Sequence, residues 1–141
     1  MKRAFLFFFI ILDLSLNSQT SMNIDSLILK ISNVNLESII LYQHVLDHDS
    51  NGFLLPEKDL LGTKDTLCNQ LFLIGKECSE KLFNSFHDPE KDYTINLILY
   101  MIYSRDAFDM IPYKTKKDIC AWRLYQKDKD FLRWRKIING F

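Results

Sequence analysis

The stretch from Lys76 to Arg105 constrains the fold most, because it predicts two helices joined by a stiff turn. Proline disfavours the helical conformation at the residue before it, so Pro89 predicts that the first helix stops by His87. Asp88 is then placed to cap the second helix, because its carboxylate can accept hydrogen bonds from backbone amides. Pro89 suits the first helical position, where a backbone N–H is not needed.

The two predicted helices differ in how much of their surface is apolar. The first carries a single apolar stripe, the pattern of a helix with one buried face: Cys78, Leu82, Phe83 and Phe86. The second is apolar around most of its circumference: Ile95, Leu97, Ile98, Leu99, Met101 and Ile102. About ten apolar residues are too few to span a bilayer. We therefore expect a central core helix there, and no stable membrane span in the mature protein.

Residues 75–105 resemble a single repeat of the HEAT family of helical-repeat proteins. The positions that match are Gly75, Leu82, Phe83, Phe86, Asp88-Pro89, Ile98 and Ile102. The resemblance implies a helix pair whose relatives mostly bind proteins or peptides, and it carries no catalytic residues.

The remaining sequence also predicts helices. Residues Ile24 to Leu46 form one helical pattern, weakened at 32–35 where Ser and Asn compete for backbone hydrogen bonds. Thr63 is a candidate N-cap for a helix that ends at Gly75. Thr115 and Asp118 resemble a capping box and begin a C-terminal helical region. The fold class expected is all-α: a small bundle of about five to six helices with the HEAT-like helix pair at its centre.

The N-terminus has the layout of a secretory signal. Met1-Lys2-Arg3 precedes the apolar segment AFLFFFIIL, and small and polar residues follow. We predict a signal peptide over residues 1–18, a single helical domain over 19–141, and export to the periplasm or the extracellular space. Asp13 interrupts the apolar core, and the alternatives are a buried N-terminal helix or an uncleaved anchor. Cys68, Cys78 and Cys120 allow one disulfide and one free thiol in an oxidising compartment, or three buried thiols.

The segment Asp47 to Leu54 resembles the first half of an EF-hand calcium loop. Asp47, Asp49 and Asn51 supply oxygen ligands at alternate positions, and a glycine follows for the sharp turn. The glutamate expected at the twelfth position is replaced by Lys58. We therefore expect no bound cofactor and a polar surface turn here, with a calcium ion held by Asp47, Asp49 and Asn51 as the alternative.

Charge is unevenly distributed along the chain. Residues 22–112 hold seven Lys/Arg and fourteen Asp/Glu, whereas residues 113–141 hold nine and three. Arg123, Arg133, Arg135 and Lys136 are the candidate partner-binding residues of this basic region. The alternative is that its aromatic residues complete the core and its cations form a solvated face.

No motif of a hydrolase, a nucleotide-binding protein or a metalloprotease occurs in the sequence. We therefore expect an exported, non-catalytic protein that binds another protein, of which an immunity or inhibitor protein is the most concrete version. Nucleic acid is not expected as a partner. The alternatives are a calcium-binding or calcium-stabilised module, and a small exported hydrolase that uses His44 or His48.

Overall fold

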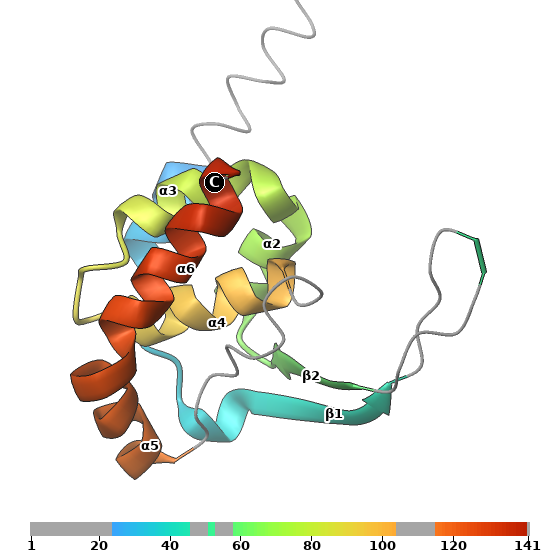
Figure 1. Ribbon diagram of the computed structural model, residues 1–141, viewed down its shortest axis with the longest axis horizontal. Helices are drawn as coiled ribbons and strands as arrows, with labels where there is room; N and C mark the ends of the chain where they lie inside the picture. The colour runs from blue at the N-terminus through green and yellow to red at the C-terminus, as the bar shows by residue number, and fades with distance from the viewer. Residues whose placement is uncertain (1–23, 46–50, 53–57, 104–114, 141) are drawn as a thin grey trace, which may run out of the picture. The chain divides into compact units, whose positions relative to one another are not determined.

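The computed structural model describes residues 24–45, 51–52, 58–103 and 115–140 (Figure 1). The chain divides into two compact units, residues 1–30 and 31–141. In the first unit, residues 24–30 are helical. The predicted signal peptide lies outside the described residues. It remains a prediction, as does the single domain over 19–141.

Two antiparallel strands replace part of a predicted helix. β1 (Ile39–Val45) pairs with β2 (Lys58–Thr63), with Ile39 opposite Thr63 and Leu41 opposite Leu61. The helix predicted over Ile24–Leu46 is therefore wrong beyond residue 30. β1 has the sequence IILYQHV, rich in the β-branched and aromatic residues that favour strands. Figure 1 shows the paired strands extending away from the helices that follow them.

Two short helices come next and lead to the predicted turn. α2 (Thr66–Ile74) is followed by the 3-10 helix η2 (Gly75–Cys78) and by α3 (Ser79–Asn84). The N-cap of α2 is Asp65, whose carboxylate accepts from the Cys68 amide at 2.9 Å, so the predicted cap at Thr63 is wrong. Gly75 is the C-cap as predicted, with φ at 72°. That positive φ is a conformation that glycine adopts without steric cost.

α4 (Asp92–Ile102) is the central helix of the second unit, residues 31–141. Ten of its 11 residues are buried, which confirms the predicted core helix. Helices α2 and α3 and strand β2 all contact it. A helix this apolar needs partners on several sides, and these elements provide them.

The start of α4 differs from the prediction. The helix begins at Asp92, and its N-cap residue Lys91 makes no capping hydrogen bond with its side chain. Asp88 instead accepts from the Glu90 amide at 3.0 Å and pairs with Lys91 at 3.3 Å, within the turn. These contacts, the Glu90 amide first, lower the pKa of the Asp88 carboxyl. The cap of α4 comes from Asn33, whose Oδ1 accepts from the backbone amides of residues 93 and 94 at 3.1 and 3.2 Å.

The C-terminal helical region contains a change of helix type. α5 (Lys116–Ala121) leads into the π-helix η3 (Trp122–Gln126) and then into α6 (Lys127–Asn139). Thr115 is the N-cap of α5, since its Oγ1 accepts from the Asp118 amide at 3.1 Å, as predicted. α6 contacts α3, and Figure 1 shows it crossing in front of α4.

The described part of the chain is mostly helical, which is compatible with the expected all-α class. Apart from the three-residue 3-10 helix η1 (Leu36–Ser38), the helices form four continuous stretches among the described residues: 24–30, 66–84, 92–102 and 116–139. This number is lower than the five to six predicted, because α2 runs through η2 into α3 and α5 runs through η3 into α6.

Candidate partner-binding surface

A buried carboxylate at the start of α4 connects the C-terminal helical region (α5, η3 and α6) to the rest of the second unit. The Asp92 side chain is 1% exposed. The Arg123 guanidinium donates to its Oδ1 from 2.9 Å, and the Lys127 ammonium donates to its Oδ2 from 3.0 Å. Two cations on one carboxylate compensate the cost of burying it.

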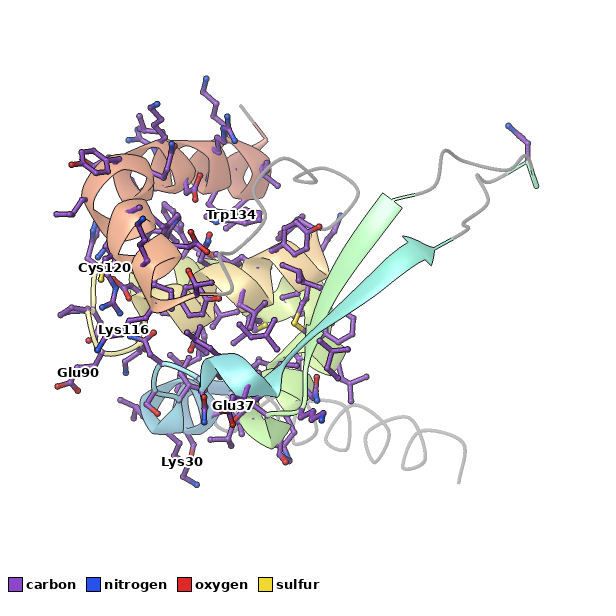
Figure 2. The ribbon with its side chains drawn as sticks, turned by 90° about the horizontal axis from the view of Figure 1, so that it is seen from below. Lys30, Glu37, Glu90, Lys116, Cys120 and Trp134 are labelled. Carbon is purple, nitrogen blue, oxygen red and sulfur yellow. The ribbon has the colours of Figure 1, made fainter. Side chains whose placement is uncertain are left out.

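Two tryptophan indoles of this region donate hydrogen bonds, one within the region and one to α4. The Trp122 Nε1–H donates to Oδ2 of Asp130 at 2.5 Å, and the Trp134 Nε1–H donates to Oδ1 of Asn96 at 2.8 Å. Both indoles are buried, and Figure 2 shows Trp134 on the side of α6 that faces α4. Phe131 stacks on Phe83 of α3 with ring centroids 4.7 Å apart. Trp122, Phe131 and Trp134 therefore complete the core, as the alternative interpretation of this region expects, whereas Tyr125 is exposed.

The π-helix explains how both tryptophans reach the same core. In an α-helix of 3.6 residues per turn, positions twelve apart such as Trp122 and Trp134 point about 120° away from each other. A π-helix has a wider turn with i→i+5 hydrogen bonds, and the Lys127 amide donates to the Trp122 carbonyl in this way. The wider turn reduces that angle. It thereby allows Trp122 to pack inward together with Asp130 and Trp134.

The opposite side of α6 carries the exposed cations of this helix. Leu132 is 54% exposed in the middle of the helix. We define the α6 outer face as this leucine and the exposed cations that flank it along the helix: Lys129, Leu132, Arg133, Arg135 and Lys136. Asp128 is the one exposed carboxylate of α6, so the net charge of its exposed residues is positive.

The four predicted partner-binding residues separate into two groups. Arg133, Arg135 and Lys136 are exposed on the α6 outer face. Arg123 is directed toward the start of α4, where its guanidinium bonds Asp92 and also donates to the Pro89 carbonyl at 3.2 Å, although its side chain remains 37% exposed. Arg123 does not belong to the α6 outer face, because its guanidinium is already paired with Asp92.

Two exposed apolar residues were not among the predicted site residues. Leu124 and Tyr125 of η3 are each 74% exposed. The sequence carries a signal for Leu124. In a helix, a residue two positions after Trp122 points almost opposite to it and cannot share its buried face. Only one of Trp122 and Leu124 can therefore belong to the core.

The predicted calcium loop lies mostly outside the described residues, which include Asn51 and Gly52 but not Asp47 or Asp49. Gly52 has φ at 82°, as a sharp turn requires. The loop connects β1 to β2, whereas an EF-hand loop connects two helices. His48 is outside the described residues, and the His44 side chain is not described. No cluster of three or more His, Cys, Asp or Glu that could hold a metal occurs among the described residues.

The three cysteines are free thiols. Cys68 and Cys78 are buried, whereas Cys120 is exposed on α5. Burial raises the pKa of the Cys78 thiol to about 11, and it raises the pKa of Cys68 as well. A thiolate is the reactive form, so the two buried cysteines are unreactive near neutral pH.

Comparison of the chain with protein-family models, with curated proteins and with solved structures found no match. Within the described ranges, no helix combines the length and apolar character that a bilayer span requires.

Proposed function

We propose that this protein is an exported, non-catalytic binding protein that contacts an acidic partner protein through the α6 outer face. An immunity or inhibitor protein, which neutralises a toxin or a hydrolase outside the cytoplasm, is the most concrete version. The HEAT-like pairing of α3 and α4 belongs to the same proposal, since relatives of that repeat mostly bind proteins or peptides.

One observation carries this proposal: one cation of α6 pairs with the buried Asp92, whereas the others are exposed on the α6 outer face. Lys127 is committed to the buried Asp92. Arg135 and Lys136 are exposed and have no ion-pair partner among the described residues. Exposed cations beside an exposed leucine offer both electrostatic attraction and apolar contact area to an acidic surface.

Export is supported by the sequence at residues 1–18, where a positive start precedes an apolar segment. It bears on the class of partner, because an exported protein does not meet nucleic acid inside the cell. Among the macromolecules that a basic helix can bind, an acidic protein is therefore the partner that we propose.

The test is a charge-matched pair of variants in a capture experiment on extract from the host. Arg135→Gln with Lys136→Gln removes two charges from the α6 outer face. Lys116→Gln with Lys117→Gln removes two exposed charges from the first turn of α5. We expect the first pair alone to lose an acidic protein that the wild type retains at physiological salt, with unchanged helicity. Equal retention by all three proteins would refute the α6 outer face as the binding surface.

A calcium-stabilised turn at residues 47–52 is a second proposal, supported by the positive φ of Gly52. Calcium that binds only the folded state raises the melting temperature as its concentration rises above Kd. We expect Asp49→Asn to abolish such a shift. A melting temperature that does not change on addition of calcium would remove this proposal.

A further inference from the structure

Leu124 and Tyr125 are adjacent and both 74% exposed, although they lie between buried or bonded residues. Trp122 is the only buried residue of η3. Large exposed apolar residues are normal when they are scattered singly, but an adjacent leucine and tyrosine form a small patch. Tyrosine is enriched among the residues that contribute most to binding at protein interfaces.

The backbone on both sides of this pair is fixed to the core. Immediately before it, the Trp122 indole bonds Asp130 and the Arg123 guanidinium bonds Asp92. Two residues after it, the Lys127 ammonium bonds the same buried carboxylate. The pair is therefore presented by a segment that is held from behind, so little ordering entropy remains to be lost when a partner binds.

The helix type gives a second, independent reason to single out this pair. π-helical turns are rare and are frequently found at functional sites. Here the wider turn brings Trp122 inward, and it leaves Leu124 and Tyr125 exposed. An uninterrupted α-helix would have placed these side chains in a different register relative to α6.

The neighbouring α6 outer face indicates the chemistry of the partner. Leu132 has Lys129 three residues before it and Lys136 four residues after it, which are the spacings at which helical side chains are neighbours. From Tyr125 to Lys136 the helical rise is about 16 Å, or roughly three turns of a second helix. A helix that fits this surface would place apolar residues on one stripe and carboxylates on either side of it.

We propose that Leu124 and Tyr125 are the apolar anchor of the partner-binding surface, and that the partner element is an acidic amphipathic helix. The inference rests on the proposed function and specifies the class of partner. The cations of the α6 outer face supply attraction and orientation, and the pair from η3 supplies most of the apolar contact.

A synthetic peptide provides the probe: a labelled 21-residue helix with leucine at heptad a and d positions and glutamate at the flanking positions. We expect the wild-type protein to bind it with an affinity that falls as salt is raised. Leu124→Ala with Tyr125→Ala should weaken binding at least tenfold. Leu73→Ala is the matched control, because Leu73 is 81% exposed on α2 and should leave binding unchanged. Thermal unfolding of all variants should match the wild type.

Any one of four results would overturn the inference. The first is failure of the wild type to bind the peptide. The second is equal binding by the variant that lacks Leu124 and Tyr125. The third is binding of heparin, or of vesicles of phosphatidylserine and phosphatidylcholine, as tightly as the peptide. If the Arg135/Lys136 variant loses a host protein while the Leu124/Tyr125 variant retains it, the proposed function stands and this inference fails.

Discussion

The Asn33 side chain caps a helix that begins almost sixty residues later in the chain: its Oδ1 accepts from the Thr94 amide at 3.2 Å. The Asn33 amide group donates to the Pro89 carbonyl at 2.9 Å, so one side chain holds both the turn and the helix. Thr94 reinforces the contact, because its hydroxyl donates to the Ser32 carbonyl and accepts from the Val34 amide, each at 2.8 Å.

Asn33→Ala should lower the free energy of unfolding by about 1–2 kcal/mol, the cost of losing a helix cap. The matched control is Asn35→Ala, which removes a cap from the three-residue helix η1 (Leu36–Ser38) and should cost less. Chemical denaturation followed by circular dichroism measures both changes. Equal losses in the two variants would contradict the role assigned to Asn33.

Asp92→Asn should destabilise the protein by about 1–3 kcal/mol, because Arg123 and Lys127 lose their common carboxylate. The cost stays below that of breaking a fully buried pair, since the Arg123 side chain is 37% exposed and water can hydrate it. Asp128→Asn, at an exposed carboxylate one residue after Lys127, is the control and should cost less. An unfolding midpoint that is the same for both variants would contradict the proposed anchoring of the C-terminal helical region.

The Trp134–Asn96 hydrogen bond can be tested by a double-mutant cycle. Nδ2 of Asn96 is buried and has no hydrogen-bond partner among the described residues, so Trp134→Phe would leave the whole amide unsatisfied. We expect that variant to lose about 1–3 kcal/mol. Asn96→Leu should be better tolerated in the Trp134→Phe background than in the wild type, because both polar partners are then removed. Additive effects of the two substitutions would contradict the coupling.

A thiol reagent should react rapidly with Cys120 alone in the native protein at pH 8, and Cys120→Ser should remove that fast phase. Cys78 has its pKa raised from 9.0 to about 11, so its folded form favours the neutral thiol. Its contribution to stability is therefore complete below pH 9 and is lost as pH rises toward 11. Rapid labelling of more than one cysteine at pH 8 would contradict the burial of Cys68 and Cys78.

Local sequence patterns were sufficient for several features whose physical cause is local, although the N-cap of α2 was assigned to Thr63 and is Asp65. The apolar circumference of residues 95–102 identified the core helix, and Gly75 and Thr115 were identified as caps because their roles depend on neighbouring residues. The weak patch at 32–35 was also identified as the point where a helix could break. These features follow from side-chain periodicity and from the conformations that each residue type prefers.

The tertiary structure overturned two of the local predictions. Residues 39–45 were predicted to continue the helix that starts at Ile24, but they form a strand that pairs with β2. Asp88 is a good local cap, yet Asn33 caps α4, because the chain folds back to the start of that helix.

The same distinction applies to the candidate surface. The sequence by itself determined that the C-terminal region is basic and aromatic. The folded structure decided which of its residues turn inward, since only there does Arg123 meet the buried Asp92 and only the π-helical turn brings Trp122 to the core. These choices depend on contacts between residues far apart in the chain, and local periodicity carries no information about such contacts.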